Sequence, residues 1–195
     1  TWHRTMTPEH LHSLLSHVAA GDLPVEDALE RLKGFPVATV GASHEPVARL
    51  DTQRAMRHGF PEVVMAEGKK FSHLSQIIEA SLTRPGHLLI TRVGKKRAKK
   101  LLAQFPDLTH DAEARALYRR EGDEKQGLVA VLCAGTSDLP VAQEAALTAR
   151  MLGARVETHF DAGVAGLHRL LAADDLLKRA RVFVVAAGME GALPS

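Results

Sequence analysis

Short apolar runs alternate with helical segments in the last third of the chain, and this alternation constrains the fold most. Residues 128–132 read LVAVL and residues 182–185 read VFVV. A run without polar side chains on either face is typical of a strand buried on both sides of a parallel sheet. Between the two runs we predict a helix over residues 140–152, a strand over 156–160 and a helix over 166–173. This order predicts a doubly wound, three-layer α/β domain with right-handed crossovers.

The N-terminal 35 residues predict a helical hairpin. Thr7 supplies a capping oxygen and Pro8 fits the first helical position, where its missing N–H costs nothing. Leucine and valine then recur at helical spacing until Gly21. A second, shorter helix is expected over residues 24–33, with Gly34 as its stop.

The middle of the chain predicts a small α/β or α+β domain. Apolar runs at residues 62–66 and 87–93 flank a helix over 71–82, which makes a β-α-β unit, and a further helix follows Gly94. Residues 107–126 are charged and lack sustained periodicity, so they are expected to form a linker or an irregular crossing segment at the domain boundary. The predicted domains are residues 1–35, 36–125 and 126–195.

Composition excludes several classes of protein. The single cysteine, Cys133, rules out an intramolecular disulfide and a multi-cysteine metal site. The N-terminus lacks the order of a signal peptide, and no apolar run approaches the ~20 residues of a membrane-spanning helix. A cytoplasmic protein without a membrane partner is therefore expected. The net charge of +2 is too small to predict nucleic-acid binding. The one basic cluster in the sequence, residues 95–100, is interpreted as a solvated helix face, with anion steering or a contact to a phosphate as the alternative.

Three strand-to-helix loops are expected along one edge of the sheet, because the carboxyl ends of parallel strands point the same way. They are residues 135–138, 161–166 and 188–191, and all contain glycine. Glycine lets backbone N–H groups approach an anion, and a helix N-terminus favours negative charge. The alternative is ordinary turn chemistry, with Asp138 as a helix cap. Neither GxGxxG nor a Walker loop is present, so no standard phosphate motif decides between them.

Four segments, in order, look very like the LarB family. They read RLDTQRAMRHGFPEVVMAEGK, AGTSDLPVAQEA, DAGVAGLHRLL and VVAAGMEGALPS, and the resemblance covers roughly residues 46–195. The family comprises the pyridinium-3,5-biscarboxylic acid mononucleotide synthases that begin assembly of the nickel-pincer nucleotide cofactor of lactate racemase. Their C-terminal domain is similar to the purine-pathway enzyme that moves a carboxylate on aminoimidazole ribonucleotide.

The resemblance implies the substrate nicotinic acid adenine dinucleotide. The ring would be carboxylated with CO2 or bicarbonate, and the pyrophosphate hydrolysed with release of AMP. Mg2+ on the pyrophosphate and a symmetric homo-oligomer, a tetramer or an octamer, are expected. The family's nucleophilic cysteine is expected after the third strand, beyond Ser195, so the sheet domain is expected to be incomplete at its C-terminus and the chain inactive without that segment. Cys133 is interpreted as part of a buried strand instead.

The resemblance and the predicted edge together give the candidate residues. Candidates for binding the nucleotide are Gly135, Thr136, Ser137, Asp138, Asp161, Gly163, His168, Gly188, Met189, Glu190, Gly191 and Arg54. Candidates for catalysis are Asp51, Glu67 and Lys69, and Glu190 is also the candidate for a metal ligand. For Asp51 and Arg54 the alternative is a helix cap with a salt bridge, and His168 has the alternative of a surface histidine.

Two other functions remain open at this stage. The first is a carboxyaminoimidazole ribonucleotide mutase or carboxylase of purine biosynthesis. Aligning Arg169 with the corresponding arginine of that enzyme places its two histidines at Val164 and Ala192, which argues against it. The second is a non-catalytic nucleotide-binding module.

Overall fold

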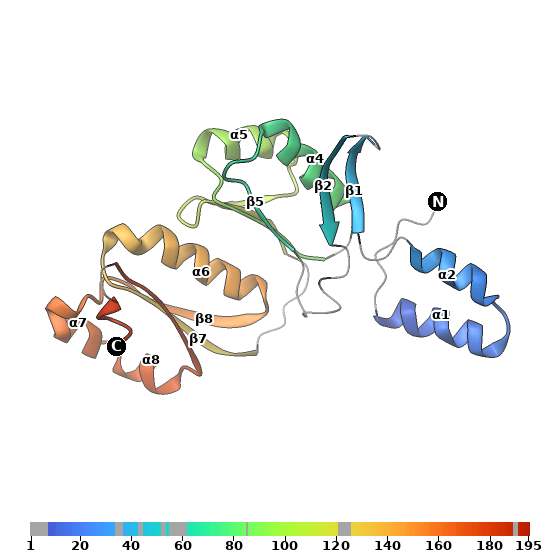
Figure 1. Ribbon diagram of the computed structural model, residues 1–195. Helices are drawn as coiled ribbons and strands as arrows, with labels where there is room; N and C mark the ends of the chain where they lie inside the picture. The colour runs from blue at the N-terminus through green and yellow to red at the C-terminus, as the bar shows by residue number, and fades with distance from the viewer. Residues whose placement is uncertain are drawn as a thin grey trace. The chain divides into compact units, whose positions relative to one another are not determined.

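The computed structural model describes residues 8–33, 37–42, 45–51, 54, 62–84, 86–120, 126–188 and 191–195. The chain forms two compact units, shown in Figure 1. The first unit comprises Thr1–Val64 and Gly68–Leu88, and the second comprises Met65–Glu67 and Leu89–Ser195. The second unit contains most of the candidate site residues.

The first unit begins with the predicted helical hairpin. Helices α1 (Pro8–Ala20) and α2 (Val25–Lys33) contact each other. Gly21, at φ 79°, ends α1 by donating its N–H to the carbonyl of Val18. The two helices that sequence periodicity predicts are therefore confirmed.

An antiparallel hairpin follows, which the sequence did not reveal. Strands β1 (Val37–Ala42) and β2 (Glu45–Asp51) pair from Val37 opposite Asp51 to Ala42 opposite Glu45, with a register shift between Val40 and Gly41. Helix α4 (Phe71–Leu82) contacts both strands. Its buried face comprises Leu74, Ser75, Ile77 and Ile78, which recur at helical spacing.

A four-stranded sheet has the order β3, β4, β6, β5. Its strands are β3 (Val63–Met65), β4 (Leu88–Thr91), β5 (Thr109–Asp111) and β6 (Ala116–Arg119), and helix α5 (Lys95–Gln104) follows β4. The expectation of an irregular linker was wrong for β5 and β6, which form an antiparallel hairpin. The Asp111 carboxylate accepts the N–H groups of Glu113 and Ala114, and Arg115 lies at φ 51°, so polar residues close this turn. Strands of three and four residues are too short to show a period in the sequence.

A three-stranded parallel sheet forms the last part of the chain, as predicted. Strands β7 (Gln126–Cys133), β8 (Ala154–His159) and β9 (Val182–Ala186) have the order β8, β7, β9. Both neighbouring pairs are parallel. The helices of this part are α6 (Leu139–Met151), α7 (Leu167–Leu171) and α8 (Asp174–Arg179). The single helix predicted over residues 166–173 is the short α7 followed by a turn, and α8 was not predicted.

The central strand β7 is buried on both faces, which explains its continuous apolar run. Leu128, Ala130 and Leu132 form one core cluster with Leu176 of α8. Val131 and Cys133 point to the opposite face, where they form another cluster with alanines of α6. Figure 1 shows α6 and α8 on opposite sides of the sheet. The three-layer α/β fold class is therefore confirmed.

Helix α6 also packs outside its own sheet. Its Leu147 and Met151 form a core cluster with Leu89 of β4 and with two alanines. Ala116 is the first residue of β6, and Ala114 lies in the turn before it. Within the second unit, α6 therefore has apolar contacts to two sheets. In the described part of the chain, no helix has the length and apolar character needed to cross a membrane.

Candidate functional site

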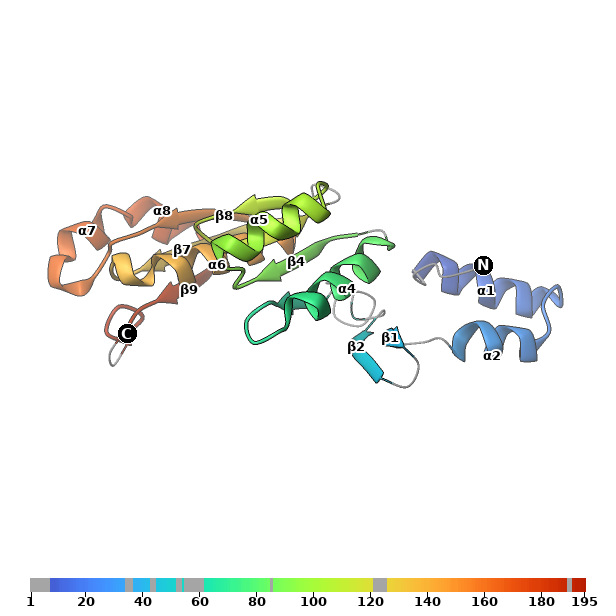
Figure 2. The ribbon, with the colours of Figure 1, turned by 90° about the horizontal axis from the view of Figure 1, so that it is seen from above.

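The carboxyl ends of the three parallel strands meet through backbone hydrogen bonds. Ala162, after β8, donates its N–H to the Cys133 carbonyl at 2.9 Å, and Ala134, after β7, donates to the Ala186 carbonyl at 3.0 Å. Figure 2 shows α7 and the C-terminal turn at this same end of the sheet. The loops after β7, β8 and β9 thus share one edge, which we call the rim.

The loop after β7 is closed by its own backbone and by Asp138. Gly135 donates its N–H to the Asp138 Oδ2 at 3.1 Å, and Asp138 donates its N–H to the Gly135 carbonyl at 3.0 Å. Thr136 and Ser137 are exposed on this turn, immediately before α6. Hydroxyl donors beside the N-terminus of a 13-residue helix suit an oxyanion. Asp138 therefore holds the loop, while Thr136 and Ser137 present donors to solvent.

The loop after β8 is shaped by an ion pair. Arg169 Nη1 donates to Asp161 Oδ2 at 2.7 Å, and the two side chains are 39% and 55% exposed. Asp161 has φ 57°, a left-handed conformation that is unfavourable for a residue with a Cβ atom. His159 Nε2 lies 2.7 Å from the Arg169 carbonyl oxygen. Because a carbonyl only accepts, Nε2 of His159 carries the proton in this contact.

Two glycines in this loop permit close approaches, Gly166 to the Arg169 side chain and Gly163 to the Ala134 carbonyl. A Cβ atom on Gly166 would lie 2.7 Å from Arg169 Nε, and one on Gly163 would lie 3.0 Å from the Ala134 carbonyl oxygen. Arg169 Nε is buried without a hydrogen-bond partner among the residues that the structure describes. An unsatisfied buried donor costs about 1–3 kcal/mol, so this position is unusual for a purely structural arginine.

Sequence reasoning missed Arg169 and His159 as site residues. The signal was present in AGLHRLL, because Gly166, which accommodates the guanidinium, lies shortly before Arg169. The neighbouring candidate His168 is exposed on α7.

The loop after β9 is described only in part. Gly188 is exposed and Gly191 has φ 67°. Met189 and Glu190, two of the predicted site residues, lie outside the described residues. Among those that are described, no group of three or more His, Cys, Asp or Glu side chains is arranged to hold a metal ion.

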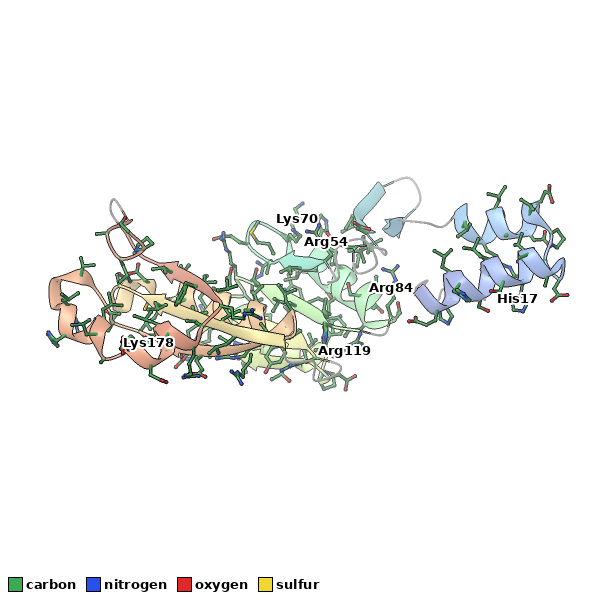
Figure 3. The ribbon with its side chains drawn as sticks, turned by 90° about the horizontal axis from the view of Figure 1, so that it is seen from below. His17, Arg54, Lys70, Arg84, Arg119 and Lys178 are labelled. Atoms are coloured by element: carbon green, nitrogen blue, oxygen red, sulfur yellow. The ribbon has the colours of Figure 1, made fainter. Side chains whose placement is uncertain are left out.

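The other candidates lie outside the three-stranded sheet. Asp51 and Arg54 are partly buried, and the Asp51 N–H donates to Glu62 Oε2 at 3.1 Å. Arg54 is labelled in Figure 3. Lys69 is also partly buried, whereas Glu67 is exposed and pairs with Arg92 at 2.8 Å. Glu67 belongs to the second unit, together with the rim, and the other candidates belong to the first.

Cys133 is a poor nucleophile in this position. Its side chain is fully buried, and it donates a weak hydrogen bond to the Gly135 carbonyl at 3.6 Å. Burial is the main cause that raises the pKa of this thiol, and the negative charges of Asp138 and Asp161 raise it further. The reactive thiolate is therefore scarcer than in an exposed cysteine.

The fold and the rim define a doubly wound α/β protein whose strand-to-helix loops gather at the carboxyl ends of its strands, the edge where this class of protein binds ligands. The family model described as the LarB/PurE-like N-terminal domain matches residues 42–121. An uncharacterized protein of Methanocaldococcus jannaschii is 32% identical over 200 residues, which cover 96% of this chain and 75% of the relative. The chain belongs to the LarB family, which is related to carboxylases and mutases.

Proposed function

We propose that this protein carboxylates the pyridinium ring of nicotinic acid adenine dinucleotide and hydrolyses its pyrophosphate, as the first step of nickel-pincer cofactor synthesis. The observation that carries the proposal is the rim itself. Ala162 of the LarB-like motif DAGVAGLHRLL donates its N–H there to the carbonyl of Cys133, the residue immediately before the LarB-like motif AGTSDLPVAQEA. The rim presents Thr136 and Ser137 in the loop after β7 and Arg169 after β8, and these side chains are donors suited to a nucleotide phosphate.

The reaction needs a nucleophile because a cationic ring resists attack on CO2. Addition of a thiolate to the ring makes a ring carbon electron-rich, and that carbon forms the new C–C bond with CO2. A base then removes the ring proton from this carbon, and the thiolate leaves with its electron pair, which restores the aromatic cation. No oxidant is consumed. In the proposal the thiolate is the nucleophilic cysteine that the family resemblance implies and not Cys133, because Cys133 is buried.

The described side chains divide between binding and proton transfer. We assign Thr136 and Ser137 to the phosphate, and Asp138 to closing their loop. Glu67 is the candidate base in the same unit, with Asp51 and Lys69 as the other catalytic candidates.

Mg2+ and CO2 or bicarbonate are part of the same proposal. Mg2+ keeps several waters and often binds through phosphate oxygens with one or two carboxylates. An ion carried by the pyrophosphate therefore needs no cluster of three protein ligands, and none of the steps above runs through it. We also propose a homo-oligomer, a tetramer or octamer, which light scattering of the full-length protein checks.

The experiment uses full-length protein with the dinucleotide, 13C-labelled bicarbonate and Mg2+. We expect AMP and a mononucleotide that carries one labelled carboxylate. Ser137→Ala should raise KM, whereas Ser13→Ala, at an exposed position on α1, should match the wild type. Absence of the labelled product would sink the proposal.

The same preparation tests the purine-type carboxylate shift. Exposed Val164 and Ala192 stand where alignment to the purine enzyme puts histidines, so we expect no turnover of carboxyaminoimidazole ribonucleotide. Turnover of that substrate alone would favour the purine-type reaction over the pyridinium carboxylation.

A further inference from the structure

The guanidinium of Arg169 lies where the loops after β7 and β8 approach each other. The position that a Cβ atom on Gly163 would take is 3.0 Å from the Ala134 carbonyl oxygen and 3.9 Å from Arg169 Nη2. Ala134 immediately precedes the loop with Thr136 and Ser137. Arg169 is therefore placed beside the phosphate-binding loop of the proposed site, although its own helix follows the neighbouring strand.

Among the described residues, this arginine uses one of its side-chain nitrogens as a donor. Nη1 donates to Asp161, while Nε and Nη2 have no partner among the described residues. A guanidinium has five N–H donors in a rigid fork that matches carboxylate and phosphate oxygens. A salt bridge with a solely structural role needs no unused N–H donors, and it needs no left-handed backbone at Asp161.

The charges at the rim also favour a role for Arg169 in binding an anion. Asp138 and Asp161 both lie close enough to raise the pKa of Cys133 by their negative charge. An anionic substrate that approaches two carboxylates is repelled unless a cation is beside them. Arg169 supplies that cation at Asp161.

We propose that Arg169 binds a phosphate group of the nucleotide substrate, and that Asp161 is a positioning residue that holds its fork at the rim. The identity of the substrate rests on the proposed function, whereas phosphate binding by Arg169 does not. The fork contacts the phosphate through Nη2, which has no partner among the described residues, whereas Nε is buried and does not reach the substrate.

The test measures the Kd values of AMP and adenosine for full-length protein by calorimetry. Arg169→Met should weaken AMP binding about tenfold or more and leave adenosine binding unchanged, because adenosine lacks the phosphate. Arg169→Lys, which keeps the charge without the fork, should recover part of the loss. Arg181→Met is the matched control, because Arg181 is exposed at the opposite, amino end of β9.

Two further variants keep Arg169 and displace it. Gly166→Ala puts a Cβ atom 2.7 Å from Nε, and the end of this flexible side chain can move without unfolding the loop. Asp161→Asn removes the charge that holds the fork. Both should weaken AMP binding less than Arg169→Met does and leave adenosine binding unchanged.

Several outcomes overturn the inference. If the Arg169 variants lose equal affinity for AMP and for adenosine, Arg169 has a structural role. If they bind AMP as tightly as Arg181→Met does, Arg169 does not contact the phosphate. Wild-type protein that binds no AMP also overturns it. If wild-type protein binds AMP through Arg169 but does not carboxylate the dinucleotide, the proposed function fails and this inference stands.

Discussion

Arg92 Nη1 donates a hydrogen bond to Glu67 Oε2 at 2.8 Å, which joins the turn after β3 to the turn after β4. The backbone reinforces this link, because Ala66 donates its N–H to the Thr91 carbonyl at 2.9 Å. Arg92 has φ 56°, in the left-handed region. A candidate catalytic carboxylate is thus held by a residue with an unfavourable backbone conformation.

Substitution of Arg92 separates these two effects. Arg92→Gly relieves the left-handed backbone, which costs roughly 1–2 kcal/mol for a residue with a Cβ atom. Arg92→Ala keeps that cost, and both variants lose the exposed ion pair. We therefore expect Arg92→Gly to unfold in urea with a free energy about 1 kcal/mol above that of Arg92→Ala. Equal stabilities would show that the backbone at Arg92 carries no strain.

Arg179 of α8 binds both carboxylate oxygens of Glu157 on β8, at 2.9 and 2.7 Å. This pair lowers the pKa of Glu157 below its usual 4.5, the hydrogen bond from Arg179 being the largest cause. A carboxyl group whose pKa is lower in the folded state stabilises the protein at pH values above its pKa in the unfolded state. This stabilisation is lost as the pH falls through its pKa in the folded state.

Arg179→Gln should therefore lower Tm by at most a few degrees at pH 7. The difference from wild type should fade below pH 4.5, as Glu157 becomes protonated, and also in 1 M salt. Calorimetry across pH, with Arg181→Gln as the control, checks both trends. A difference that persists in acid would mean that Arg179 acts through packing instead.

The burial of Cys133 predicts low thiol reactivity. Because burial raises the thiol pKa, native protein at pH 8 should react with a thiol reagent at least about a hundredfold more slowly than urea-unfolded protein. Cys133→Ala in the full-length protein should retain AMP release. A folded Cys133→Ala variant without turnover would instead identify Cys133 as the nucleophile.

Sequence patterns predicted the helices and strands in which several successive or regularly spaced residues are buried. The strand at residues 128–132 was readable because β7 is covered on both faces, by α6 and α8. The β1–β2 hairpin and the β5–β6 hairpin were missed. Part of the signal of the β5–β6 hairpin is local turn chemistry, the Asp111 cap, and the charged residues around it hide this signal.

The candidate site was predictable to the extent that it follows from topology. Parallel strands place their carboxyl ends together, so the loop residues Thr136, Ser137 and Asp161 were found from the sequence. The contact from Asp161 to Arg169 was not, because it depends on a left-handed φ at a residue that is not glycine. Such an angle arises from tertiary structure and has no periodic signature.

The N-terminus of α5 has an unfavourable charge, which a single substitution can reverse. Its first turn holds Lys95 and Lys96 and no acidic residue. Lys95 also repels Lys99, one turn later. Lys95→Glu places a carboxylate at the positive end of the helix dipole, worth about 0.3–1 kcal/mol, and forms an ion pair with Lys99 worth about 0.2–0.5 kcal/mol. We expect the free energy of unfolding to rise by about 1 kcal/mol in urea.

Lys99→Glu is the matched control, because it changes the same charge in the middle of the exposed face and far from the dipole. It should stabilise the protein less than Lys95→Glu does, and an equal gain would contradict the dipole argument.

The two variants also separate the two interpretations of residues 95–100. A solvated face leaves kcat/KM for the dinucleotide unchanged in both variants, which is what we expect. Anion steering would lower kcat/KM in both, with a difference that vanishes at high salt, because screening removes long-range attraction.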